Sequence, residues 1–133
     1  MKKIILFNPR AGQFVKIIPN AILQIAAAIE GKCDYVIVDG NREHDPFLKI
    51  KSYLDSDEFG YFCSTVMPGP QTVQAIHFSK EIRKSYSHIK IIWGGYFASN
   101  QHEVVVRSGY VDYVVNGPGD IALPSLLEAL AKN

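Results

Sequence analysis

Five short apolar runs recur along the chain, and between them lie longer segments in which apolar residues return every three or four positions. The runs are richer in Ile, Val, Tyr and Phe than in charged residues, a pattern typical of buried strands. They span residues 3–7, 34–38, 59–63, 89–93 and 112–115. The sequence therefore predicts a regular alternation of strand and helix.

The segments between the runs have the spacing of helices that bury one face against a sheet. Three of them open on a proline, which suits the first helical turn because its missing N–H has no partner there. In the third segment, Val73, Ile76 and Ile82 are expected to share the buried face. The expected helices span residues 19–30, 46–54, 70–86, 100–108 and 120–131.

Near-continuous apolar strands joined by helices predict a parallel sheet covered on both faces, because right-handed crossovers place the helices there. We expect one flavodoxin-like (Rossmann-like) domain over residues 1–133: a doubly wound five-stranded parallel sheet, order 2-1-3-4-5, in three α/β/α layers. Ligands of such folds bind at the carboxyl ends of the strands. The loops expected at that edge are residues 8–13, 39–45, 64–69, 94–99 and 116–120.

Composition argues against several kinds of partner. Fourteen Lys and Arg residues against thirteen Asp and Glu residues give a formal net charge of +1, without a basic cluster longer than two residues, so no nucleic-acid partner is indicated. The first apolar run is too short for a signal peptide and is interrupted by Asn8-Pro9, so we expect a cytoplasmic protein without a membrane partner. Cys33 and Cys63 form no C-x-x-C pair and are expected to be small buried thiols.

The loops lack the motifs of common phosphate-binding and catalytic sites. The first loop has neither the G-x-G-x-x-G fingerprint of dinucleotide-binding folds nor a P-loop. A phosphorylated receiver domain would need acidic residues after the first strand and an aspartate ending the third, where this chain has Asn8 and Cys63-Ser64. Ser64 also lies outside a G-x-S-x-G elbow and has no matching His and Asp. We therefore expect no catalysis by this domain alone.

Small residues gather instead at three neighbouring strand ends. Ser64 and Thr65 end the third strand, a Gly-Gly pair at 94–95 ends the fourth, and a Gly-Pro-Gly at 117–119 follows the fifth. Any one of these glycines is typical of a turn. Three such segments in register predict a deep ligand cleft with little side-chain bulk.

With these features the chain resembles, over nearly all its length, the cobalamin-binding domain of cobalamin-dependent radical S-adenosylmethionine enzymes. In the wider cobalamin-binding fold, the dimethylbenzimidazole tail of the cofactor enters a slot lined by an S-x-L element after the third strand and a G-G element after the fourth. Ser64-Thr65-Val66 matches the first with Val for Leu, and Gly94-Gly95 matches the second. The resemblance implies that the Ser64 hydroxyl bonds the base and that the glycines make room for the tail.

Other segments resemble the radical-enzyme branch in their order and placement: Asn8-Pro9, Asp39-Gly40-Asn41, and residues 67–71, 94–98 and 115–120. Tyr96 and Phe97 are expected either to pack on the edge of the corrin ring or to cover the sheet. The cobalamin contacts that the resemblance implies are Asn8, Pro9, Ser64, Thr65, Val66, Met67, Gly69, Gln71, Gly94, Gly95, Tyr96, Phe97, Asn116, Gly117 and Gly119.

The chain departs from that family in two ways. The D-x-H-x-x-G element, which gives cobalt a histidine ligand, is absent, so the resemblance implies base-off cobalamin without a protein histidine and no metal ligand is assigned. Surface or packing roles are expected for all four histidines, with His44 as the one considered for an approach to the cofactor. The cysteine trio for a 4Fe–4S cluster is also absent, so methyl transfer would need an attached radical S-adenosylmethionine domain, in cis or in trans.

Two alternatives stay open. The domain could keep the fold, no longer bind cobalamin and serve as a docking or interaction module. The same cleft could instead bind another nucleotide-like ligand, although the missing phosphate loops argue against it.

Overall fold

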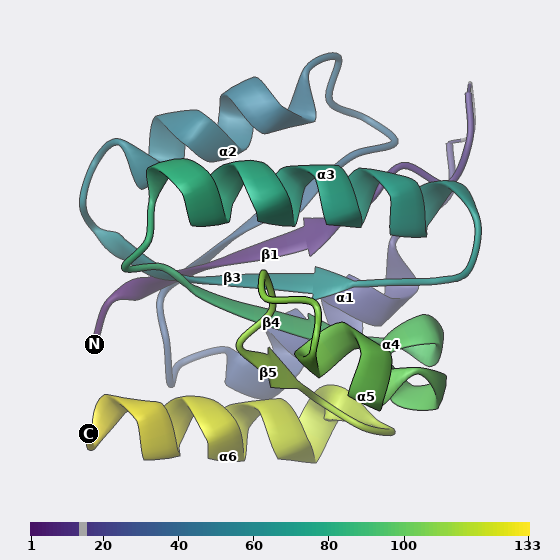
Figure 1. The fold of residues 1–133 in the computed structure, drawn as a ribbon. Coiled ribbons are helices and arrows are strands. Elements are labelled where there is room, and N and C mark those ends of the chain that lie inside the picture. Colours follow the sequence, from purple (N-terminus) through teal and green to yellow (C-terminus); the bar gives the residue numbers. More distant parts are fainter. Residues whose placement is uncertain (14–15) are drawn as a thin grey trace.

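The computed structural model describes residues 1–13 and 16–133 and has the predicted architecture (Figure 1). A parallel five-stranded sheet, in the order β2-β1-β3-β4-β5, lies between two layers of helices. The strands are β1 (Lys3–Asn8), β2 (Tyr35–Asp39), β3 (Phe59–Thr65), β4 (Lys90–Gly94) and β5 (Tyr113–Val114). The helices are α1 (Asn20–Ile29), α2 (Pro46–Leu54), α3 (Pro70–Ser85), α4 (Tyr96–Asn100), α5 (His102–Val106) and α6 (Gly119–Ala131). The predicted flavodoxin-like fold is confirmed.

The two faces of the sheet carry separate apolar cores. Alternation along β1 sends Ile5 and Phe7 to one face and Ile4 and Leu6 to the other. Helices α2 and α3 pack on the first face, while α1 and α6 pack on the second. Because both faces are covered, the strands are apolar throughout, and polar chemistry is left to the strand ends.

Element boundaries differ from the prediction mainly at the carboxyl edge. Strand β3 continues to Thr65, because Ser64 pairs with Phe7 and Thr65 pairs with Gly94. The expected loop at 94–99 and helix at 100–108 are replaced by the short helices α4 and α5. The backbone N–H of Phe97 donates to the carbonyl of Val66 at 3.0 Å, which fixes the start of α4 against the end of β3.

Of the three residues predicted to share the buried face of α3, Ile82 is buried and Ile76 packs partly buried against the same core, but Val73 does not. Val73 is 70% exposed, whereas Ala75, Phe78 and Ile82 are buried against the sheet. These three follow the i, i+3, i+7 spacing of a single stripe. Phe78 stacks on Phe7 with ring centroids 5.2 Å apart, which sets the rotation of the helix.

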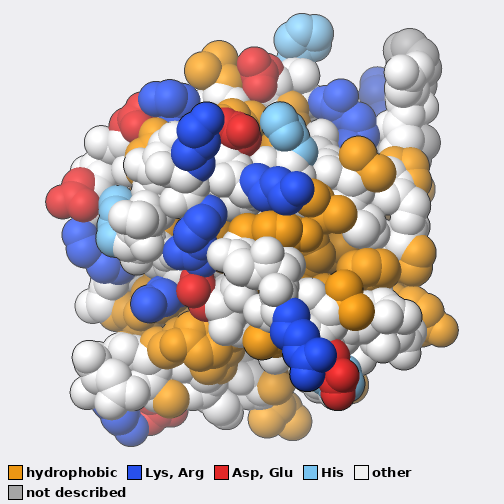
Figure 2. All heavy atoms as spheres, viewed as in Figure 1, with side chains coloured by type: hydrophobic (Ala, Val, Ile, Leu, Met, Phe, Trp, Pro, Cys, Tyr) orange, Lys and Arg blue, Asp and Glu red, His pale blue; other side chains and the backbone are white. Residues whose placement is uncertain are grey.

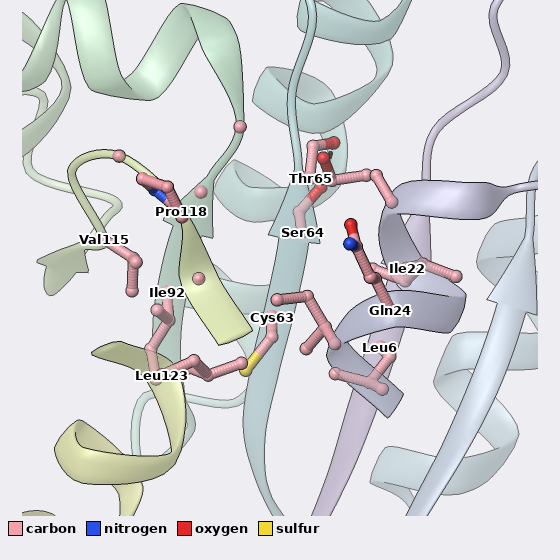
Figure 3. Close-up of a pocket in the computed structure, with 16 residues that line it drawn as sticks. Leu6, Ile22, Gln24, Cys63, Ser64, Thr65, Ile92, Val115, Pro118 and Leu123 are labelled. Carbon is pink, nitrogen blue, oxygen red and sulfur yellow. Dashed lines mark hydrogen bonds between the residues drawn. The ribbon is translucent and has the colours of Figure 1, made fainter. Parts of the chain in front are cut away.

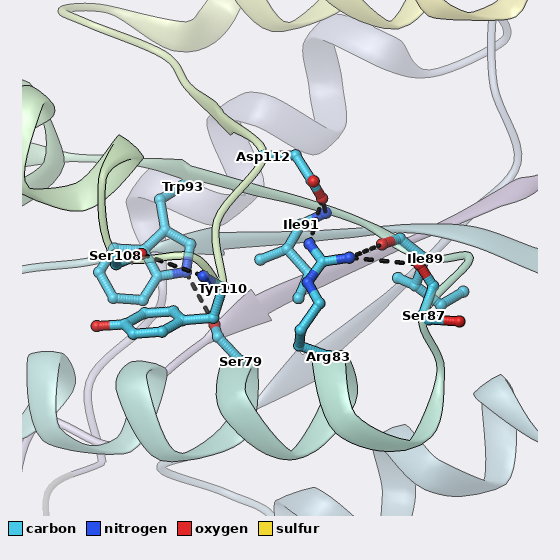
Figure 4. A network of polar contacts seen from close by, with 9 residues as sticks. All are labelled: Ser79, Arg83, Ser87, Ile89, Ile91, Trp93, Ser108, Tyr110 and Asp112. Atoms are coloured by element: carbon cyan, nitrogen blue, oxygen red, sulfur yellow. Dashed lines mark hydrogen bonds and ion pairs between the residues drawn. The ribbon is translucent and has the colours of Figure 1, made fainter.

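A polar network joins α3 to the amino-terminal side of β4 and β5 (Figure 4). Arg83 donates to Asp112 Oδ2 at 2.5 Å, and the same oxygen accepts the backbone N–H of Ile91 at 2.8 Å. Deeper in the core, Trp93 Nε1 donates to Ser79 Oγ at 3.0 Å. The partly buried Arg83–Asp112 pair lies at the amino-terminal side of the sheet, away from the carboxyl edge, so Asp112 has a structural role.

Candidate functional site

A cavity of about 190 Å³ lies at the carboxyl edge of the sheet, where α1 and α6 cover β1, β3 and β4 (Figure 3). The strand order reverses between β1 and β3, so the cavity occupies the place where doubly wound folds bind ligands. Six residues predicted as ligand contacts contribute to its lining: Ser64, Thr65, Gly94, Gly95, Gly117 and Gly119.

The floor of the cavity is a row of apolar side chains from three adjacent strands. The parallel register places Leu6 of β1 beside Cys63 of β3, and Cys63 beside Ile92 of β4. Each is at most 4% exposed. Ile22 of α1 and Leu123 of α6 line the cavity from the helical side. Burial raises the pKa of the Cys63 thiol to about 12, so this residue stays neutral and adds to the apolar floor.

Ser64 and Thr65 border the cavity nearer the carboxyl edge, and Thr65 shares the face of β3 with Cys63. Figure 3 shows Ser64 and Thr65 together at one end of the cavity, with Cys63 and Leu123 toward the other. Ser64 is buried, and its hydroxyl donates to the Thr65 carbonyl at 3.3 Å, a long bond. The cavity is therefore apolar at its floor and polar near its mouth.

The structure requires glycine at only one of the two glycine positions that end β4. At Gly94 the backbone is ordinary, and an added Cβ would have only the Cβ of Val115 nearby, at 3.8 Å. At Gly95 φ is +93° and ψ is −176°, a region open essentially to glycine, and a Cβ would lie 2.9 Å from Thr65 Oγ1 and from the Val66 backbone nitrogen. The chain itself requires glycine at 95. At position 94 the surrounding residues leave room for a side chain larger than that of glycine.

The Gly-Pro-Gly segment forms the opposite rim. Gly117 has φ of +84°, and its N–H donates to Ser99 Oγ at 2.9 Å, which ties the loop to α4. A Cβ on Gly119 would lie 2.8 Å from Cδ1 of Ile25 in α1. Glycine at this position lets α6 begin close to α1 beside the cavity.

Asn8, Pro9 and Gln71 lie outside the cavity lining, in a buried network beneath the loops. Gln71 Nε2 donates to the Pro9 carbonyl at 2.9 Å and to Asn8 Oδ1 at 3.3 Å, while its Oε1 accepts the Met67 N–H at 3.1 Å. Asn8 Nδ2 donates to Asp39 Oδ1 at 3.1 Å. The two side-chain amides therefore hold the ends of β1, β2 and β3 together.

Other predicted contacts are spread over the carboxyl edge. Val66 is fully buried in the core on the α2–α3 face, so its side chain packs away from the cavity. Phe97 packs against the same core, as expected for a residue that covers the sheet. The remaining predicted contacts lie exposed at this edge and are Met67, Gly69, Tyr96 and Asn116.

The apolar lining from the helices was missed in the sequence. Ile22 and Ile25 of α1 and Leu123 of α6 face the cavity. Helical periodicity marks such residues as buried, but it does not distinguish packing on the sheet from lining a space beside it. The signal available was their position in the first turns of two helices that start at the carboxyl edge.

The surface at the carboxyl edge is less charged than the rest of the face in view. Figure 2 shows hydrophobic side chains gathered on the right, where the strands end, while most charged side chains lie to the left. Within residues 1–13 and 16–133, no group of three His, Cys, Asp or Glu side chains is placed to hold a metal ion. No helix in the described part of the chain is long and apolar enough to cross a membrane.

No protein-family model and no curated protein matches the chain. Solved structures with a similar fold do match. The radical S-adenosylmethionine methyltransferase TsrM from Kitasatospora setae aligns over 99% of this chain and 26% of its own, with 21% identity and a TM-score of 0.83. The cobalamin-dependent S-adenosylmethionine radical enzyme OxsB, with aqua-cobalamin and S-adenosylmethionine bound, aligns over 99% of this chain and 19% of its own, with 16% identity and a TM-score of 0.84.

The same fold also occurs in proteins of another class. The two-component response regulator RcsB, in complex with DNA, aligns over 99% of this chain and 61% of its own, with 17% identity and a TM-score of 0.67. The alignments of the preceding two enzymes show that this chain spans about a quarter of TsrM and a fifth of OxsB. The comparisons establish the fold.

Proposed function

We propose that this domain binds cobalamin, with the nucleotide tail of the cofactor in the cavity between the sheet and helices α1 and α6. The observation that carries the proposal is the free space at Gly94, a glycine that neither backbone conformation nor packing requires. Glycine in a strand weakens it, so a ligand that approaches the backbone closely gives this residue a reason.

The residues around the cavity fit such a tail. The apolar floor of Leu6, Cys63 and Ile92 suits an aromatic base, whose burial is favourable in proportion to the apolar area removed from water. Thr65 shares the face of β3 with Cys63, so its hydroxyl could donate to a ring nitrogen of that base. The corrin ring would then lie over the carboxyl edge, beside the exposed side chains of Met67 and Tyr96.

One further similarity supports the proposal. OxsB, whose structure contains aqua-cobalamin, shares this fold with a TM-score of 0.84, against 0.67 for RcsB. The first loop offers no histidine for cobalt, so the cofactor would bind base-off without a protein histidine below the metal. Cobalamin would supply the cobalt-centred chemistry, and the domain would bind and orient it for a radical S-adenosylmethionine domain in cis or in trans.

Thermal unfolding tests the proposal against a docking module that has lost the ligand. A ligand that binds only the folded protein stabilises it, and at about 100 times its Kd it adds about 2.7 kcal/mol, or roughly 5–10 °C in Tm for a domain of this size. We expect this rise with hydroxocobalamin, followed by circular dichroism.

Flavin mononucleotide and adenine nucleotides are the matched controls, because each offers an aromatic base without a corrin ring. Stabilisation by one of these and not by hydroxocobalamin would assign the cavity to another nucleotide-like ligand. An unchanged Tm with every compound would favour the docking module, for which Tyr96, 64% exposed at the carboxyl edge, is the natural contact.

A further inference from the structure

We propose that the cavity selects among cobamides by their lower base, accepting benzimidazole bases and rejecting purines. This inference rests on the proposed function, because it assumes that the nucleotide tail enters the cavity. It follows from where the cavity has hydrogen-bonding groups and where it has none.

The inner part of the cavity offers a base no side-chain polar partner among the described residues that line it. Leu6, Cys63 and Ile92 form the floor, while Ile22 and Leu123 close it from the helices. The Cys63 thiol is a weak hydrogen-bonding group. The strands at this level are paired to neighbours on both sides, so their backbone groups are already used by the sheet.

The space is of the right order for a fused aromatic ring system. An apolar cavity of about 150 Å³ in another protein stays dry and binds benzene. This cavity is about 190 Å³ and is partly open to solvent, so a bicyclic base can enter with its sugar still outside. The base would then lie between the apolar floor and the side chains of α1 and α6.

Benzimidazole and purine bases place different demands on this lining. A benzimidazole attached to its ribose has one free ring nitrogen, which the hydroxyl of Thr65, on the same face of β3 as Cys63, can satisfy. Adenine adds an exocyclic amino group and two further ring nitrogens. Each buried polar group without a partner costs about 1–3 kcal/mol. The methyl groups of dimethylbenzimidazole instead bury more apolar surface against Leu6 and Leu123.

Gln24 is the polar side chain on the α1 side of the cavity, and it is exposed. Figure 3 shows its amide directed toward Ser64 and Thr65 rather than toward Leu6, Cys63 and Ile92, so it would contact the polar part of the tail that both cobamides share. A Gln24→Leu change should therefore leave the ratio of the two affinities unaltered.

The test is a parallel titration of the intact chain with three compounds: cobalamin, the adenine-containing cobamide, and cobinamide, which has no nucleotide tail. We expect the adenine cobamide to bind about 10- to 100-fold more weakly than cobalamin, because one or more of its polar atoms stay unpaired. Cobinamide should bind more weakly than cobalamin as well.

A pair of variants at Cys63 probes the floor directly. Cys63→Ser places a hydroxyl there at almost constant size and should narrow the gap between the two cobamides, whereas Cys63→Ala should preserve it. The wild-type ratio decides the inference even if a variant fails to fold. Equal binding of cobalamin and the adenine cobamide overturns the inference and leaves the proposed function standing. Binding of cobinamide as tight as cobalamin overturns both, since the tail would then lie elsewhere, and so does binding of none of the three.

Discussion

A Gly94→Val protein should fold at least as stably as the wild type and should bind cobalamin about 100-fold more weakly, or not at all. Valine suits a strand better than glycine, and replacing glycine where the backbone allows it stabilises by about 0.4–1 kcal/mol, through the unfolded chain. The new side chain points toward Val115, into the cavity. Overlap of this size with a rigid ring costs about 1–3 kcal/mol or excludes it. Thermal unfolding and visible titration measure the two effects separately.

Gly94→Ala is the graded control, because its single methyl group reaches only ordinary contact with Val115. Its affinity should lie between those of the wild type and the valine variant. Loss of folding in Gly94→Val would mean that the space at this position is not free. A folded Gly94→Val protein with wild-type affinity would remove the cavity from the binding site.

Gly95→Ala, unlike Gly94→Val, should destabilise the fold. It should lower the free energy of unfolding by about 3 kcal/mol, whether or not a ligand is present. A non-glycine residue at this φ and ψ costs of order 1–3 kcal/mol, and the added Cβ would also press on the Val66 backbone at 2.9–3.0 Å. Urea unfolding measures the loss.

Gly31→Ala separates these two contributions. Gly31 has φ of +77° but nothing within 4 Å of an added Cβ, so only the backbone conformation should count, at about 1–2 kcal/mol. If Gly95→Ala and Gly31→Ala lower the free energy of unfolding equally, the close packing between Gly95 and Val66 does not contribute to stability.

The fold could be predicted from the sequence because every level of pattern agreed. Apolar runs of strand length, helices with one apolar stripe and their strict alternation leave few topologies open. The errors arose where local pattern is ambiguous. From the sequence, either Val73 or Ala75 could lie on the buried face of α3. Stacking of Phe78 on Phe7 fixes the rotation of the helix, so Ala75 is buried and Val73 is exposed. Helix α4 begins directly after a glycine pair, which in sequence indicates a loop.

The position of the candidate cavity could be predicted where it depends on strand ends. Ser64, Thr65 and Gly94 follow apolar runs whose carboxyl ends must meet at one edge of a parallel sheet, so their proximity follows from the topology. Two distinctions between ligand-binding and structural residues could be made only from the structure. A polar side chain in such a loop can serve a ligand or the chain, and Gln71 is bonded to Asn8 and to neighbouring backbone.

The roles of two adjacent glycines also cannot be distinguished from the sequence. One can leave space for a ligand while the next is required by its own backbone. That difference appears only in the torsion angles and in what an added Cβ would touch.

We propose that the carboxyl edge of this sheet holds a cobalamin tail in a preformed cavity. The most direct test is to titrate the wild-type chain with hydroxocobalamin and follow the visible spectrum, with Gly94→Val beside it. We predict a saturable spectral change at micromolar concentrations for the wild type and none for the variant. A wild-type spectrum that stays that of free hydroxocobalamin throughout, or the same saturable change in both proteins, would rule out binding of the tail in this cavity.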